Sequence, residues 1–187
     1  MNRLTKYAIF LAFCKLWDLY STWLCTPTLS REMNPVTTFF GLHWLGVIIF
    51  QIITLIITLF IVRRSIRTDS ALLPNTPGLT PLQVTTWVAF GDLRSGWNLL
   101  WSFGASFDRR WYYFSGLLLF TEPIAHLFAG MHNLASAYIT SYMAWTYKYP
   151  LIKAMAAIVF VVALGFCFFA FREFAAYRVK PTSNLVS

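Results

Sequence analysis

The sequence predicts an all-α membrane protein with four transmembrane helices, and composition and charge distribution support this fold class. Hydrophobic residues make up 58% of the 187-residue chain, and only 12% of the residues are charged, compared with roughly 25% in a typical soluble domain. The charged residues are clustered, so long uncharged runs remain between them. Such runs reach the ~20 residues that a helix needs to cross the hydrocarbon core. We therefore expect one integral membrane domain over residues 1–187.

The first crossing is predicted over residues 4–25, a length that matches the hydrocarbon core. Arg3 and Lys6 precede this run, as basic residues precede the core of a signal peptide. However, Lys15 and Asp18 interrupt the apolar core, and no small-x-small cleavage site follows. These features favour a helix that is retained.

The second crossing is predicted over residues 35–62, and it completes a helical hairpin over residues 1–64. Asn34-Pro35 is a helix-start signal, because Asn is a good N-cap and Pro suits the first helical position. Arginines follow the run and mark its end. The predicted span is longer than the membrane needs, so we expect this helix to tilt or to project.

Residues 65–110 are the least apolar part of the chain and are predicted to form a cytoplasmic interfacial segment. Prolines and a glycine mark turns in its first half. Over residues 82–107, tryptophan and phenylalanine alternate with polar residues, which indicates one or two interfacial or re-entrant helices. A full crossing is disfavoured because it would place Asp92 and Arg94 near its centre.

The second helical pair is predicted over residues 111–180. One crossing spans residues 111–131, and the other spans residues 151–171, before the basic residues near the C-terminus. Between them, residues 133–149 are rich in Tyr, Ser and Thr. This composition suits either a cap on the outer face or an extension of the preceding helix, and Pro150 ends the stretch.

Lysine and arginine residues set the expected orientation. The N-terminus, the middle segment and the C-terminus are basic, whereas the two opposite loops hold little beyond Arg31 and Lys148. Four crossings with both termini in the cytoplasm satisfy the positive-inside rule, whereas a fifth would export the basic tail. Because topology explains the net charge of +8, we expect no nucleic-acid partner.

A polar site is predicted in the hairpin, because an ionisable group inside an apolar helix is costly unless it is paired, solvated or functional. Asp18 and Thr22 are four residues apart and share a helix face, and Lys15 can reach Asp18. One interpretation is a Lys15–Asp18 pair that lowers the cost of burying both charges. The other is that Asp18 binds a cation or a proton, with Thr22 supplying a hydroxyl. Glu32 and Asn34 lie at the outer end of the hairpin.

These residues resemble a family of small prokaryotic membrane proteins of uncharacterised function. The family carries an Asp-x-x-x-Thr helix, a short loop, Glu-x-Asn-Pro, and a second helix with a polar residue, often a lysine. The resemblance covers residues 8–65 or so, and Gln51 stands at or close to the position of that lysine. It implies a two-helix hairpin with a polar cluster, in a bacterial plasma membrane, and it implies no reaction. The matching positions are Asp18, Thr22, Glu32, Asn34 and Pro35.

The predicted third crossing carries a second polar cluster. Glu122 and His126 are four residues apart and share a helix face, while Pro123 predicts a kink between them. By helix rise, Glu122 falls near the depth of Asp18, so the two clusters would be able to converge. A divalent metal such as zinc, iron or manganese would suit Glu122, His126 and His132, although no spacing matches a signature such as H-E-x-x-H.

Three classes of function follow. The first is an accessory or structural subunit of a larger membrane assembly, or a homo-oligomer; membrane lipids and other subunits or further copies would be its partners. The second is a small transporter or channel for protons or cations that uses Asp18, Glu32 and Glu122. The third is a metal-dependent membrane enzyme that uses Glu122, His126 and His132. The lack of a phosphate loop and of a nucleophile elbow favours a role other than catalysis.

Overall fold

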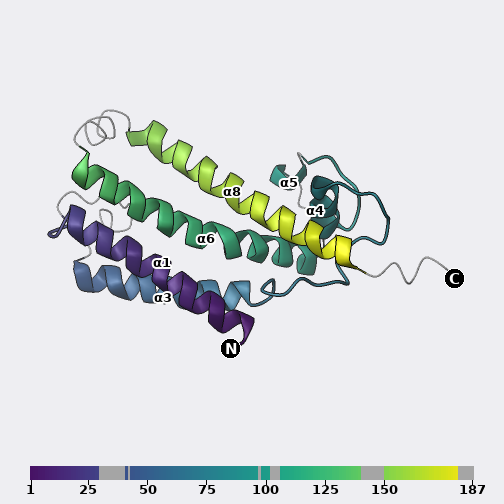
Figure 1. The fold of residues 1–187 in the computed structure, drawn as a ribbon, viewed down its shortest axis with the longest axis horizontal. Helices are drawn as coiled ribbons and strands as arrows, with labels where there is room; N and C mark the ends of the chain where they lie inside the picture. The colour runs from purple at the N-terminus through teal and green to yellow at the C-terminus, as the bar shows by residue number, and fades with distance from the viewer. Residues whose placement is uncertain (30–40, 42, 97, 102–105, 140–149, 181–187) are drawn as a thin grey trace. The chain divides into compact units, whose positions relative to one another are not determined.

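The computed structural model describes residues 1–29, 41, 43–96, 98–101, 106–139 and 150–180. Within these residues the fold is all-α (Figure 1). Each of the long helices has the length and apolar composition to cross a membrane, in α8 from Lys153 onward. The long helices are α1 (Arg3–Cys25), α3 (Trp44–Val62), α6 (Phe107–Tyr138) and α8 (Pro150–Val179), and the short ones are α4 (Pro81–Phe90) and α5 (Asn98–Trp101).

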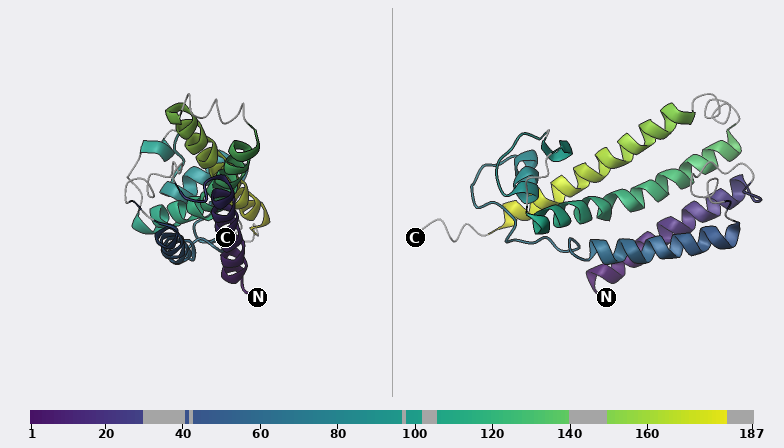
Figure 2. Two further views of the ribbon diagram at one scale, coloured as in Figure 1. Left: turned by 90° about the vertical axis from the view of Figure 1, so that its left-hand side faces the viewer. Right: turned by 180° about the vertical axis from the view of Figure 1, so that it is seen from behind.

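The chain divides into two compact units. Unit 1 comprises Met1–Phe60 and Thr121–Ala163, and unit 2 comprises Ile61–Phe120 and Leu164–Ser187. Helices α6 and α8 therefore contribute one part to each unit. In unit 1, α1 and α3 run side by side, as Figures 1 and 2 show from several directions.

Helix α1 begins where the sequence predicts. The side chain of Asn2 caps it by accepting a hydrogen bond from the backbone N–H of Thr5 at 2.7 Å. It ends at Cys25, after which the backbone N–H of Thr26 still donates to the carbonyl of Thr22 at 2.8 Å. The predicted crossing over residues 4–25 is thus confirmed as a helix.

Helix α3 begins at Trp44, so the predicted start at Pro35 is wrong for the residues just before Trp44. Gly41 has a φ of +60°, which is a left-handed conformation that a right-handed helix excludes, and His43 is not helical. The Asn34-Pro35 signal lies outside the described residues. The indole Nε1 of Trp44 donates to the carbonyl of Pro27 at 2.6 Å, which ties the start of α3 to the chain that leaves α1.

The predicted interfacial segment contains the two short helices. Helix α4 starts with a capping box in which Thr80 and Gln83 bond reciprocally, and it ends at Gly91 with a φ of +86°. Asp92 and Arg94 follow and form an ion pair at 2.7 Å. The Asp92 carboxylate accepts hydrogen bonds from this guanidinium and raises the pKa of Arg94. The two charges therefore pair in a turn and not inside a crossing.

Helices α6 and α8 are longer than predicted. Helix α6 continues past Met131 to Tyr138, so the first residues of the stretch 133–149 extend the helix, while residues 140–149 lie outside the described part. Helix α8 does not end before Arg172 but continues to Val179. Arg172 is accommodated because its Nη1 donates to the carbonyl of Ser65 at 2.7 Å. Both helices exceed one hydrocarbon thickness and must tilt or project.

Unit 2 has an aromatic and aliphatic core. The buried side chains of α4 pack here against residues of α6 and α8, and the rings of Tyr113 and Phe169 meet edge to face at 5.6 Å between centroids. The buried members of this core are Leu73, Val84, Val88, Ala89, Tyr112, Tyr113 and Phe169.

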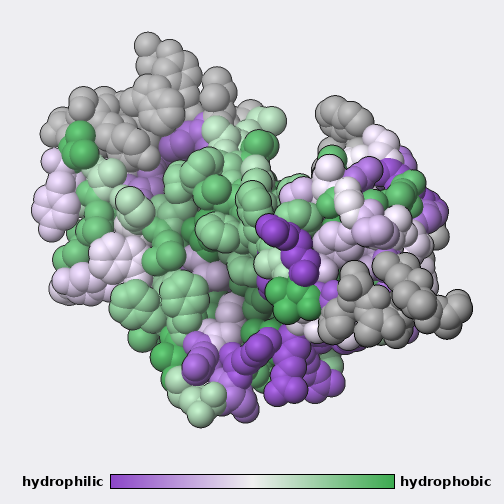
Figure 3. Space-filling view, turned by 45° about the vertical axis from the view of Figure 1, so that its right-hand side comes forward, coloured by the Kyte–Doolittle hydropathy of each residue, from purple (hydrophilic) through white to green (hydrophobic). Residues whose placement is uncertain are grey.

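Large hydrophobic side chains are exposed along the long helices. On α3 they include Ile56 and Phe60, which are 61% and 60% exposed. Figure 3 shows hydrophobic side chains gathered over much of the visible face. A surface of this kind suits contact with lipid tails and supports the membrane assignment.

Candidate functional site

The candidate site lies in unit 1, where the ammonium group of Lys15 on α1 is almost fully buried. The Lys15 residue is 4% exposed. On the side of α3, its Nζ lies 3.0 Å from Oε1 of Gln51 and 3.1 Å from Oγ1 of Thr54. On the side of α6, it lies 2.9 Å from Oε1 of Glu122 and 2.8 Å from Nε2 of His126. Lys15 therefore joins three helices.

His126 on α6 links this lysine to a second carboxylate. Its Nδ1 lies 2.8 Å from Oδ2 of Asp18 on α1, and its Nε2 faces Lys15. An ammonium group can only donate hydrogen bonds, so Nε2 must be the acceptor and must carry no hydrogen. The ring hydrogen is then on Nδ1, where it is donated to Asp18. This contact pattern assigns a neutral His126 ring.

The charged cluster, which we define as Lys15, Asp18, Glu122 and His126, holds an imbalance of charge. With His126 neutral, its described side chains comprise two carboxylates and one ammonium. Thr58 on α3 adds a neutral hydroxyl 3.4 Å from Oε1 of Glu122. One negative charge is left without a matching positive charge inside helices that suit a membrane, which is an expensive arrangement.

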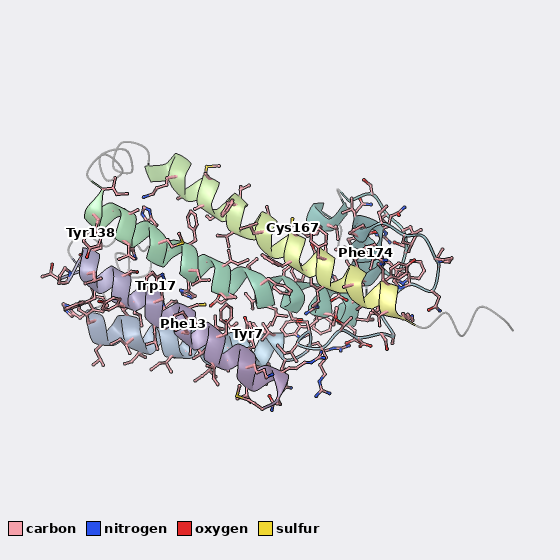
Figure 4. All side chains as sticks on the ribbon, in the orientation of Figure 1. Tyr7, Phe13, Trp17, Tyr138, Cys167 and Phe174 are labelled. Atoms are coloured by element: carbon pink, nitrogen blue, oxygen red, sulfur yellow. The ribbon has the colours of Figure 1, made fainter. Side chains whose placement is uncertain are left out.

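A close approach of α1 and α6 supports the cluster on its C-terminal side along α6. A Cβ atom placed on Gly130 would lie 2.3 Å from ring atoms of Trp17, whose side chain is labelled in Figure 4. One turn further, the Asn133 amide donates to Oγ1 of Thr22 at 2.9 Å and to Oγ of Ser21 at 3.4 Å. Small residues let two membrane helices approach, and side-chain hydrogen bonds then hold them together.

The structure corrects the ion pair predicted within α1. Lys15 pairs with Glu122 at 2.9 Å, and Asp18 pairs with His126 at 2.8 Å. The physical reason is that α6 offers each charge a partner on the facing helix. Thr22 does not act as an oxygen donor beside Asp18 but accepts the hydrogen bond from Asn133.

The other predicted site residues fall in different places. Gln51 belongs to the site through its bond to Lys15, whereas Glu32 and Asn34 lie outside the described residues. His132 is not brought to the cluster: its Nε2 lies 3.1 Å from Nζ of Lys153. It follows His126 by six residues, which is about 9 Å of helix rise, and it points to a different side of α6.

The predicted metal ligands are therefore not gathered. Among the residues that the structure describes, no three His, Cys, Asp or Glu side chains are placed to hold a metal ion together. Around His126, Asp18 and Lys15 already contact the two ring nitrogens.

Sequence reasoning did not single out Thr54 and Thr58 of α3. Together with Gln51 they are spaced by three and four residues, so they share one face of an otherwise apolar helix. This polar stripe was a readable signal. Asn133 was also missed, and it gives no local signal because its partners lie on α1.

Unit 2 contains a second buried ion pair. Glu173 is fully buried, and its Oε1 accepts hydrogen bonds from Arg172 and, at 3.0 Å, from the hydroxyl of Tyr112. The Arg172 guanidinium also lies 5.1 Å from the ring centroid of Phe169. These contacts connect α8 with α6 and with the turn after α3, and they serve packing within unit 2.

Comparisons with protein-family models, curated proteins and solved structures found no match for this chain. The chemistry of the charged cluster is therefore the basis for a functional assignment.

Proposed function

We propose that this protein is a small membrane transporter or channel for protons or other monovalent cations, with the charged cluster as its binding site. The observation that carries this proposal is the convergence of Lys15, Asp18, Glu122 and His126 into one hydrogen-bonded group with an excess of negative charge. Ionisable groups in membrane helices commonly mark ion paths and proton relays.

A purely structural role explains this charge balance less well. Replacing a buried ion pair by apolar residues of similar volume is often neutral or stabilising, so packing alone does not call for four ionisable groups. A structural pair would also have matched charges, because each unmatched charge adds a desolvation cost. A site that takes up one cation or proton gains its missing positive charge when it is loaded.

The membrane and orientation form part of the proposal. Both termini are cytoplasmic, because the basic residues then lie on the inner side, and the resemblance to prokaryotic proteins favours a bacterial plasma membrane. That family often has a lysine at or near the position of Gln51. Here the ammonium group of Lys15 lies 3.0 Å from Gln51, so a cation occupies the same place beside the second helix.

The test is ion flux in liposomes that contain the purified protein. Proton flux is followed with an internal pH dye, and sodium and potassium fluxes are followed with tracer ions. We expect Asp18→Asn and Glu122→Gln to reduce flux at least tenfold, while Thr22→Val, which changes a neighbouring group outside the cluster, retains most of it. Absence of flux for every ion tested, from a folded protein, would refute the proposal.

The accessory-subunit role is the second candidate. Aromatic side chains along α1 are exposed, among them Phe13 at 60% and Tyr20 at 55%, and either lipid tails or another protein would cover them. Native mass spectrometry from mild detergent separates the cases. A stable homo-oligomer or a co-purifying subunit, combined with normal assembly of Asp18→Asn and no flux, would favour this role over transport.

A further inference from the structure

We propose that His126 is the group that binds the ligand of the cluster, that this ligand is one proton, and that its uptake transfers Nε2 of His126 from Lys15 to Glu122. The inference deepens the proposed function, because it names the transported species and the atom that holds it. It rests on the distances around His126 and not on any flux.

The first argument is the number of hydrogen bonds open to Lys15. An ammonium group has three hydrogens, whereas among the described side chains four acceptor atoms lie within 3.1 Å of Nζ. If His126 stops accepting, Lys15 still has Gln51, Thr54 and Glu122. The lysine can therefore release the ring without leaving a buried donor unsatisfied, which would otherwise be costly.

The second argument is that a new partner for Nε2 is already in place. Oε1 of Glu122 lies 3.6 Å from Nε2 of His126, one turn away on the same helix. This distance is slightly too long for a hydrogen bond, and a small movement of either side chain would close it. A protonated Nε2 would donate to Glu122, while Nδ1 keeps its bond to Asp18. The ring would then bridge two carboxylates.

The third argument is the charge around the ring. From α1, His126 faces the cation Lys15 and the anion Asp18; from its own helix it faces Glu122; and the polar groups of α3 around Lys15, Gln51 and Thr54, are neutral. A proton on Nε2 balances the two carboxylates with two cations. The same proton would oppose Lys15 at 2.8 Å, so the two events, uptake and loss of this contact, are coupled.

The chemistry of the step is simple. A proton arrives from water, and the lone pair of Nε2 forms the new N–H bond, so no bond within the protein breaks. The ring changes from neutral imidazole to imidazolium. Release reverses the step: water accepts the proton from Nε2, and Lys15 donates to the ring again.

The test is a pH titration of the protein, labelled with ¹⁵N-histidine, by NMR in lipid nanodiscs from pH 5 to pH 9. Spectra of His126→Gln and His132→Gln assign the ring signals. At high pH we expect His126 as the neutral Nδ1–H form, and at low pH as imidazolium. In Lys15→Met the midpoint should rise by about one pH unit or more, because a nearby like charge is removed, while the midpoint of His132 stays unchanged.

Two results would overturn the inference. One is a His126 ring that keeps the same protonation state over the whole range in the wild type, a reading that needs no variant. The other is an unchanged midpoint in a folded Lys15→Met protein. If that variant does not fold, Glu122→Gln provides the complementary test, since loss of the carboxylate should lower the midpoint.

The outcomes for the inference and for the proposed function can be separated. A titrating His126 without any flux would leave the proton site standing and remove the transport role. Flux of sodium or potassium with a His126 that never titrates would keep transport and remove the proton as its ligand.

Discussion

Replacement of Gly130 by alanine tests the close contact of α1 and α6 that holds the charged cluster. The new methyl group would lie 2.3 Å from ring atoms of Trp17, whereas non-bonded carbon atoms normally stay at about 3.5 Å or more. Trp17 would have to retreat by about 1 Å. Such a shift pushes α1 away from α6 and strains the hydrogen bond between Asn133 and Thr22.

The expected size follows from two opposing effects. Overpacking in a well-packed interior costs about 1–3 kcal/mol, while alanine in a helix gains up to about 1 kcal/mol over glycine. The net result is a loss of about 1 kcal/mol, which corresponds to roughly 2–4 °C in Tm for a protein of this size. Thermal unfolding in detergent, followed by tryptophan fluorescence or circular dichroism, measures it.

A double variant provides the control. In a Trp17→Leu background the clash is removed, so Gly130→Ala should then be neutral or stabilising, and the two changes should not be additive. The sign of the single change decides the matter. If Gly130→Ala raises Tm in the otherwise wild-type protein, the helix propensity acts alone, and the close approach of the two helices is refuted.

Two further predictions concern the ion pair of unit 2 and the metal content. Arg172→Met should lower Tm by about 6–12 °C, because it leaves the buried carboxylate of Glu173 without its partner at a cost of about 3 kcal/mol; Arg178→Met, at an exposed position of the same helix, should change Tm little, and equal effects would contradict the account. Elemental analysis of the purified protein should find less than stoichiometric zinc, iron or manganese, because Lys15 occupies the position in front of Nε2 of His126, and one metal ion per chain would restore the metalloenzyme hypothesis.

Local sequence patterns predicted the helices better than their ends. Apolar runs identified all four crossings, because length and hydropathy are properties of the segment itself. The ends depended on particular residues. Gly41 adopts a left-handed conformation just before α3, and Arg172 continues α8 because the carbonyl of Ser65 accepts its hydrogen bond. A charge in a sequence marks a helix end only when the fold supplies no partner for it.

The candidate site was predictable in part for the same reason. Spacing along one helix placed Glu122 and His126 on one face, and their contact across 3.6 Å agrees with that. The choice of partners was not predictable: Lys15 and Glu122 are 107 residues apart in sequence, and nothing near Lys15 favours that carboxylate over Asp18. Only the packing of α1 against α6 decides between them.

The most direct test of the central claim compares flux in two variants that carry the same substitution on the same helix. His126→Gln removes the ring that joins Asp18 to Lys15, whereas His132→Gln changes a histidine outside the charged cluster. With equal amounts of folded protein in matched liposomes, the account predicts that proton flux falls at least tenfold in His126→Gln and stays near the wild-type rate in His132→Gln. Equal flux in both variants would show that the charged cluster is not the ion-binding site.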